Sequence, residues 1–241
     1  MLVSRKAAGA LFVGGGIALT LGSLLYPAML GVQKVNTSPD RIIARPATGP
    51  LTEADRDFVV QVRASGLWEY PVAQMALQKG TTKAVKTAGE HLLDGHASLD
   101  AACRAAAVRL AITLPDQPSP QQQGFMAQLN ADSGKRFDTD MATILHATNG
   151  RLLSTIANIR TTTKNSLIRT LADQANDTVM DHITQLEKTG RVDFDQAALR
   201  ETAPPGLPAR NLTPPPPAPG RPQVVLTPPA NSTSSPNPSA G

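Results

Sequence analysis

Apolar side chains recur every three or four positions through most of residues 51–195, the spacing of one face of an α-helix. Prolines and glycines divide the pattern into four long amphipathic segments, at residues 52–80, 82–110, 133–160 and 164–188. A shorter segment at residues 119–130 connects the second to the third. Helices of about 25 residues span about 37 Å each, so we predict an all-α four-helix bundle. No run of residues shows convincing strand alternation.

Local signals support these boundaries. Thr52 and Asp55 have the spacing of a capping box, in which each side chain bonds to the backbone N–H of the other residue. Gly80 is a suitable stop for the first helix, and Pro71 inside it predicts a kink. The prolines between residues 115 and 120 end the second helix and predict a connection whose direction the sequence leaves open.

The chain begins with a long apolar segment, because residues 7–33 carry no charged side chain. A helix needs about 20 apolar residues to cross a bilayer, whereas the core of a cleaved signal peptide has about 7 to 15. We therefore predict that residues 1–33 form an uncleaved signal anchor in the cytoplasmic membrane, with residues 7–30 in the bilayer and residues 34–50 as a linker. Two basic residues before the segment favour a cytoplasmic amino terminus and an extracytoplasmic bundle.

The other end of the chain is rich in proline, with 13 of the 21 prolines in the last 38 residues. Such a composition favours polyproline II structure and supplies few side chains for a core. Residues 196–241 are therefore predicted to be disordered. This tail would act as a solvated spacer, or as a ligand that docks on a proline-recognising envelope protein.

The formal net charge of +4 comes from the two ends of the chain. Residues 51–202 contain 16 basic and 18 acidic side chains, which gives the bundle a charge of about −2. No basic stripe is present that could follow a phosphate backbone, so nucleic-acid binding is not expected.

Three ionisable side chains interrupt the apolar faces of the helices. They are Glu69 in the first helix, His96 in the second and His182 in the fourth. In the third helix, Asn149 lies at the edge of the apolar face and His146 about 110° from its centre. At about 1.5 Å per residue, Glu69 and the three histidines fall in one layer about 12 Å deep, whichever way the two helical hairpins are connected.

Imidazoles and a carboxylate are ligands for a divalent first-row transition metal. We therefore predict a metal site formed by Glu69, His96, His182 and either His146 or Asn149. The alternative is that each histidine is a core residue hydrogen-bonded to a neighbour, and that Glu69 pairs with one of them or with an arginine. A di-iron centre is disfavoured, because the Glu-x-x-His motif is missing.

Other chemical signals are weak. No phosphate-binding loop, serine-nucleophile motif or Cys/His finger occurs, so no catalytic residue is predicted. The single cysteine, Cys103, cannot form an intrachain disulfide and is expected to be a small core residue.

Four stretches within the bundle segment carry a family resemblance: DRDFVVQVRASGLWEYPVAQMA, AVKTAGEHLLDGHASLDA, FDTDMATILHATNGRLL and NSLIRTLADQANDTVMDHITQLEKTGRVDF. They resemble the domain of unknown function 4142, a ferritin-like family often labelled an outer membrane protein, in its actinobacterial, membrane-anchored branch. The resemblance covers residues 51–194. It implies a ferritin-like bundle outside the cytoplasmic membrane, without an established activity.

The resemblance also implies particular ligands. The family has a glutamate that matches Glu69 and histidines that match His96 and His182. Its third-helix histidine falls at Asn149, and His146, one turn earlier, is the candidate replacement.

These observations predict a membrane-anchored, extracytoplasmic helical bundle with a binding or structural role and a metal ion in its core. Two alternatives stay open. One is a ferritin-like redox or peroxide-handling metalloenzyme, and the other is a metal-free cell-envelope scaffold that presents its proline-rich tail.

Overall fold

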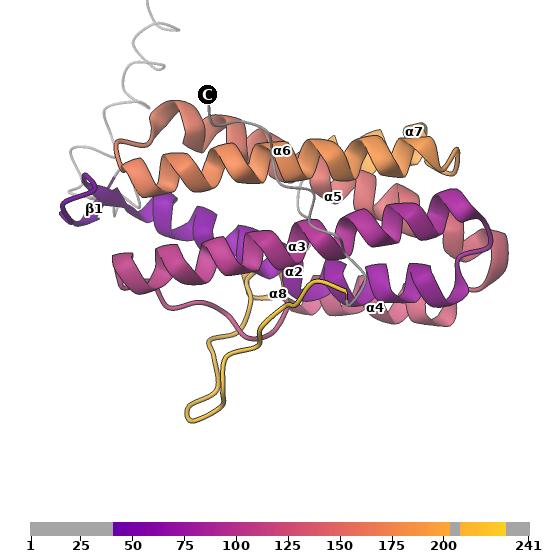
Figure 1. Cartoon of the computed structure of the whole chain (residues 1–241), viewed down its shortest axis with the longest axis horizontal. Helices are drawn as coiled ribbons and strands as arrows, with labels where there is room; N and C mark the ends of the chain where they lie inside the picture. The colour runs from indigo at the N-terminus through magenta and orange to yellow at the C-terminus, as the bar shows by residue number, and fades with distance from the viewer. Residues whose placement is uncertain (1–40, 203–207, 230–241) are drawn as a thin grey trace, which may run out of the picture. The chain divides into compact units, whose positions relative to one another are not determined.

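The computed structural model describes residues 41–202 and 208–229, and the predicted membrane anchor lies outside them. The described chain is mostly helical (Figure 1). Its elements are β1 (Ile42–Ala44), β2 (Leu51–Thr52), α2 (Glu53–Lys79), α3 (Lys83–Leu110), α4 (Pro120–Ala131), α5 (Gly134–Thr162), α6 (Ser166–Lys188), α7 (Phe194–Thr202) and α8 (Ala209–Leu212). Among these elements, no helix combines the length and the apolar composition that crossing a membrane requires.

The long helices α2, α3, α5 and α6 pack side by side as a bundle (Figure 1). α2 packs on α3, α3 on α6, α6 on α5 and α5 on α2. Each begins and ends within two residues of its predicted segment. The capping box at the start of α2 is confirmed, because Thr52 Oγ1 accepts from the Asp55 N–H (3.1 Å) and Asp55 Oδ2 accepts from the Thr52 N–H (2.9 Å). α2 continues as a helix through Pro71.

Contacts at the two ends of the bundle give its topology. Lys79, in the last turn of α2, donates to the carbonyls of Leu129 and Asp132 at the junction of α4 and α5 (2.6 and 2.9 Å). At the opposite end, Asn165 ahead of α6 donates to the carbonyl of Gly49 ahead of α2 (2.9 Å). α5 therefore starts where α2 ends and runs parallel to α3. The connection after α3 crosses back along the bundle, which is one of the two directions that the sequence left open.

The buried apolar side chains form two clusters. One includes Phe58, Val62, Leu99, Cys103, Leu152, Ile156, Ile168, Leu171 and Val179. The other includes Trp68, Val72, Leu92, Leu93, Phe137, Met141, Leu145 and Leu186. Cys103 is a core residue as predicted, and burial raises the pKa of its thiol to about 12. The thiol is therefore protonated and inert in the folded protein.

The prediction of a fold without strands is wrong at the start of the described chain. β1 and β2 form a two-stranded antiparallel sheet, in which Ile42 pairs with Thr52 and Ala44 with Leu51. This hairpin takes up part of the predicted linker at residues 34–50. Strands of three and two residues are too short to show the alternation by which a sequence reveals a strand.

The described part of residues 196–241, a tail predicted to be disordered, contains helical segments that pack on the bundle. α7 packs on α5, and α8 packs on α4. Further along, Leu226 is buried against the bundle, with an exposed fraction of only 8%. Prolines remove N–H donors from a segment, but the residues between them keep theirs, and composition alone does not show where those donors bond.

A buried ion pair between Arg63 and Asp100 joins α2 to α3, and both side chains are fully buried. Arg63 also donates to the carbonyl of Pro115 in the connection after α3 (3.3 Å) and to that of Val224 in the tail (2.7 Å). Asp100 Oδ2 accepts from the backbone N–H of Leu226 (3.0 Å). One pair of charges therefore holds two helices, the crossing connection and the tail together.

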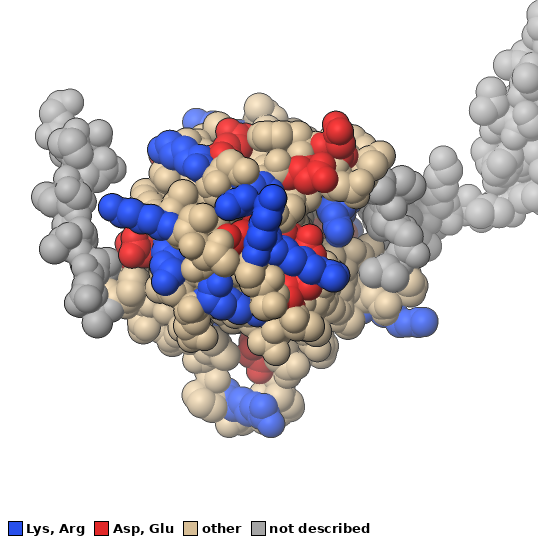
Figure 2. All heavy atoms as spheres, turned by 90° about the vertical axis from the view of Figure 1, so that its right-hand side faces the viewer, with Lys and Arg blue, Asp and Glu red and all other residues tan. Residues whose placement is uncertain are grey.

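On the end of the bundle that faces the viewer in Figure 2, basic and acidic side chains are interspersed. At the start of α5, for example, Arg136 Nε lies 2.9 Å from Asp132 and 3.6 Å from Asp140. Exposed pairs of this kind contribute little to stability. This face carries no large patch of a single charge.

The substitution Asp100→Ala is expected to lower the free energy of unfolding by about 3–5 kcal/mol, because it leaves the Arg63 guanidinium buried without its anion. Urea unfolding followed by circular dichroism measures the change. Asp57→Ala is the matched control, since Asp57 is an exposed residue of α2 that pairs with Arg56 at the surface. Equal, small effects of the two substitutions would contradict the importance of the buried pair.

Candidate metal centre

A layer of polar side chains separates the two apolar clusters. Each long helix contributes one buried residue to it: Glu69 from α2, His96 from α3, Asn149 from α5 and His182 from α6. On α3 the layer falls between Leu93 of one cluster and Leu99 of the other, and α5 and α6 repeat this arrangement. The structure thus brings four of the five predicted site residues together.

Three of these residues converge closely. One potential ligand atom each of Glu69, His96 and His182 lies within 4.8 Å of the other two, and all three side chains are essentially inaccessible to solvent. Nε2 of His96 is 3.2 Å from Oε2 of Glu69. The rings of His96 and His182 lie 4.7 Å apart between centroids, tilted by 52°. We call these three residues the Glu-His-His triad.

Asn149 holds the carboxylate of the triad in place. Its Nδ2 donates to Glu69 Oε2 (2.9 Å) and to the carbonyl of Leu145 one turn earlier (2.9 Å). Glu69 therefore has two partners on a single oxygen. These hydrogen bonds fix the orientation of the carboxylate toward the two histidines.

Several buried atoms in this layer lack a hydrogen-bond partner in the described part of the chain. They are Nδ1 of His96, both ring nitrogens of His182 and Oδ1 of Asn149. Each unsatisfied buried group costs about 1–3 kcal/mol. The backbone of His91 is close enough to affect the pKa of His182, but it makes no hydrogen bond of good geometry with the ring, so the alternative of a hydrogen-bonded core residue accounts poorly for His182. A bound cation would use these lone pairs.

The electrostatic environment keeps His182 neutral. Burial, and second the proximity of His96, hold the pKa of His182 well below its usual value of 6.5. A neutral imidazole has a free lone pair, so His182 is in the protonation state of a metal ligand at neutral pH.

Two glycines that the sequence analysis missed make room for the histidines. A Cβ at Gly95 would overlap Nε2 of His182 and lie 2.7 Å from Cγ2 of Thr178. A Cβ at Gly66 would lie 3.5 Å from Nδ1 of His96. Glycine inside a helix costs about 1 kcal/mol relative to alanine. A glycine next to a core histidine in the sequence, or across from one in the bundle, was the signal that could have identified these two positions.

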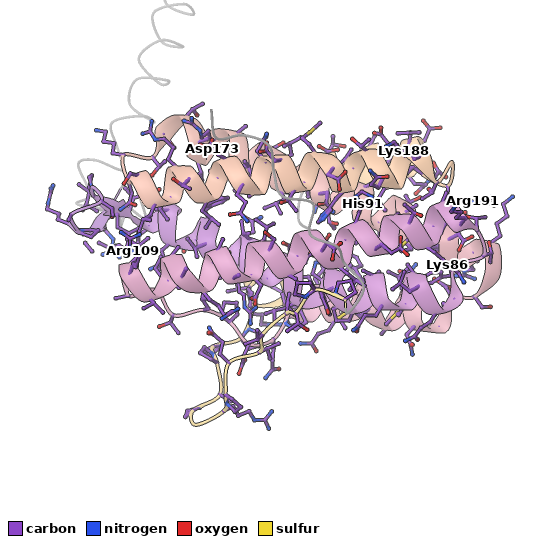
Figure 3. All side chains as sticks on the ribbon, viewed as in Figure 1. Lys86, His91, Arg109, Asp173, Lys188 and Arg191 are labelled. Atoms are coloured by element: carbon purple, nitrogen blue, oxygen red, sulfur yellow. The ribbon has the colours of Figure 1, made fainter. Side chains whose placement is uncertain are left out.

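His146 lies apart from the triad. Its Nε2 is 3.0 Å from Oε1 of Glu187, and its ring packs edge-on against Phe194. This position agrees with its angle of about 110° from the apolar face. His146 is therefore not among the residues that converge with Glu69. His91, another histidine of α3, lies at the surface near α6, with Nδ1 2.7 Å from Asp181 Oδ2 (Figure 3).

A cavity of about 600 Å³ lies beside Glu69 of the triad. Its lining comes from α2, α4, α5, α8 and the chain after α8, and includes Glu69, Trp68, Phe125 and Arg151. The rings of Trp68 and Phe125 lie 5.6 Å apart between centroids on this wall. Glu69 is thus the triad residue closest to a route from solvent.

The substitution Gly95→Ala is expected to lower the free energy of unfolding by about 1–3 kcal/mol, because the new methyl group displaces the ring of His182. Gly124→Ala in α4 is the matched control. A Cβ there meets nothing within 4 Å, so it is expected to stabilise the protein by about 0.5–1 kcal/mol. Chemical denaturation compares the two variants, and equal stabilisation by both would show that the ring does not fill the space at Gly95.

Comparison with known proteins agrees with this architecture. The family described as "Domain of unknown function (DUF4142)" matches residues 43–189, which span α2 to α6 and contain the whole polar layer. No curated protein and no solved structure matches the chain. Because the match covers more than half of the 241 residues, the chain belongs to the family of the domain of unknown function DUF4142.

Proposed function

We propose that the bundle binds one divalent first-row transition metal ion through Glu69, His96 and His182. The observation that carries the proposal is the convergence of three buried ligand atoms, from three helices, within 4.8 Å. Two imidazoles and a carboxylate suit zinc, iron or manganese better than calcium or magnesium, which prefer oxygen ligands alone. Oδ1 of Asn149, which has no hydrogen-bond partner among the described residues, is available as a fourth, weaker ligand.

The role that this arrangement supports best is binding or structural. A metal ion held by α2, α3 and α6 would add a link between three helices that already pack together and share ion pairs. Since the ligands must converge before the ion binds, its binding free energy adds to the stability of the folded bundle. At a free metal concentration 100 times the Kd, the gain is about 2.7 kcal/mol.

A second candidate, a redox or peroxide-handling enzyme, is favoured by the cavity beside Glu69. Three protein ligands leave coordination positions open, as in mononuclear iron oxygenases with two histidines and one carboxylate. A small molecule in the cavity would approach the ion from this side. Charge-transfer absorption on adding ferrous iron and oxygen to the protein would support this candidate, and its absence in an iron-loaded sample would exclude it.

We also propose that the chain represents a membrane-anchored branch of its family, with a ferritin-like bundle on the extracytoplasmic side. The support is the uncharged segment of residues 7–33 and the basic residues ahead of it. Membrane fractionation tests the anchor: the full chain should sediment with membranes, and a chain without residues 1–33 should not. Identical behaviour of the two chains would overturn the assignment.

The metal site is tested by metal analysis of protein purified without chelator or histidine tag. The wild type is expected to hold about one transition metal ion per chain, and His96→Ala and His182→Ala are expected to lose it. The matched controls are His91→Ala and His146→Ala, which remove a histidine outside the triad. Adding chelator should lower the melting temperature of the wild type and the controls but leave that of the triad variants unchanged. Equal metal content in all five proteins would refute the site.

A further inference from the structure

The described chain ends in an extended segment that crosses α2 and α3, drawn in yellow in Figure 1. We call residues 223–229 the C-terminal strap. Three side chains of the bundle bind its main chain: Arg63 donates to the carbonyl of Val224 (2.7 Å), and Tyr70 donates from its hydroxyl to the carbonyl of Thr227 (2.6 Å). Asp100 accepts from the N–H of Leu226, as described above. Within four residues, two carbonyls and one N–H are thus recognised.

The strap also inserts one side chain. Leu226 is 8% exposed, whereas its neighbour Val225 is 50% exposed and faces away. Cδ1 of Leu226 lies 3.1 Å from the position that a Cβ of Gly66 would occupy, so a side chain at position 66 would crowd the leucine. Main-chain hydrogen bonds combined with a pocket for an alternate side chain are the way proteins recognise extended peptides.

The surface under the strap therefore has the features of a peptide-binding groove. We define the α2–α3 groove by Arg63, Gly66 and Tyr70 of α2 and Asp100 of α3. The prolines that follow Thr227 restrict the strap to extended conformations, which lowers the entropy lost when it binds. The groove binds the strap mainly through hydrogen bonds to its backbone, which any peptide could make. The buried side chain of Leu226 is the contact that would select for sequence.

The groove lies next to His96 of the Glu-His-His triad. The Cβ position of Gly66 that touches Leu226 is also 3.5 Å from Nδ1 of His96, which has no hydrogen-bond partner among the described residues. Leu226 and His96 thus approach the same space beside Gly66, which a side chain would otherwise fill. With the leucine withdrawn, this space would connect His96 to the groove.

We propose that the α2–α3 groove is a binding site for an extended, leucine-containing peptide segment, which the C-terminal strap fills in the intact chain, and that release of the strap uncovers His96. Access of a metal ion or chelator to His96 by this route follows only if the proposed metal site is correct. The groove itself, and the exposure of His96, do not depend on any metal.

Histidine modification by diethylpyrocarbonate, mapped by mass spectrometry on the metal-free full chain, tests the exposure of His96. Leu226→Asp places a charge in the groove and is expected to make His96 react about tenfold faster than in the wild type. The matched control is Val225→Asp, because Val225 is exposed and the added charge is the same. His91 at the surface is the internal standard for reagent and folding (Figure 3). Equal protection of His96 in the two variants overturns the proposal.

A second variant, Tyr70→Phe, controls for the possibility that Leu226→Asp exposes His96 by unfolding the bundle. Tyr70→Phe removes the hydrogen bond to Thr227 and adds no charge, so it is expected to raise the reactivity of His96 by a few-fold while the helical circular dichroism is unchanged. An unchanged rate in Tyr70→Phe, together with loss of helical signal in Leu226→Asp, would attribute the exposure to unfolding and overturn the proposal.

Binding in trans tests the groove. A fluorescent peptide of residues 221–229 is expected to bind the Leu226→Asp chain with a Kd below about 1 mM and to restore the protection of His96. The wild type should bind it at least about tenfold more weakly, because the tethered strap competes at a high effective concentration. The same peptide with aspartate at position 226 should not bind. Failure of the peptide to bind or to protect overturns the groove, whereas a protein without metal would overturn the proposed function alone.

Discussion

Burying a carboxylate between two imidazoles in an apolar bundle is the constraint on which the other features of this protein depend. Glu69, His96 and His182 lie where the two apolar clusters meet, and an unpaired charge there is costly. The protein itself offsets part of the cost, because Asn149 and His96 both contact Glu69. Among the described residues, the ring nitrogens of His182 have no hydrogen-bond partner. A buried carboxylate beside imidazole nitrogens with unused lone pairs is complementary to a cation.

The ion pair of Arg63 and Asp100 connects this layer to the tail. Arg63 precedes Glu69 by six residues and Asp100 follows His96 by four, so the pair lies about one to two helical turns from the layer on the same two helices. Besides Arg104, which donates to Asp100 Oδ2 (2.9 Å), the other partners of the pair are backbone groups of the crossing connection and of the C-terminal strap. Without those backbone groups, two charges would be buried with fewer hydrogen bonds. The docked strap therefore stabilises the buried ion pair by hydrogen-bonding to both of its members.

The sequence predicted the elements whose signals are repeated and local. Helical periodicity located four helices, and the interruption of their apolar faces located Glu69, His96 and His182. It could not choose between the two hairpin connections, because both place the same residues in one layer. His146 has the residue type of a metal ligand, but its angle on α5, about 110° from the apolar face, argues against burial. The strap could not be predicted from the proline-rich composition of the tail, because its docking depends on one leucine and three backbone groups.

The residue at position 149 determines whether the site has three or four strong protein ligands. Structural zinc sites are usually closed by four protein ligands, whereas catalytic sites have three and leave a position open. A histidine in place of Asn149 would supply a fourth strong ligand. The amide instead donates its N–H group to Glu69. Three strong protein ligands are then left, and one of them, Glu69, also lines the cavity between α2, α4 and α5. The proposed release of the strap would add a second approach, at His96. An exchangeable ion fits this arrangement better than a permanently enclosed structural one.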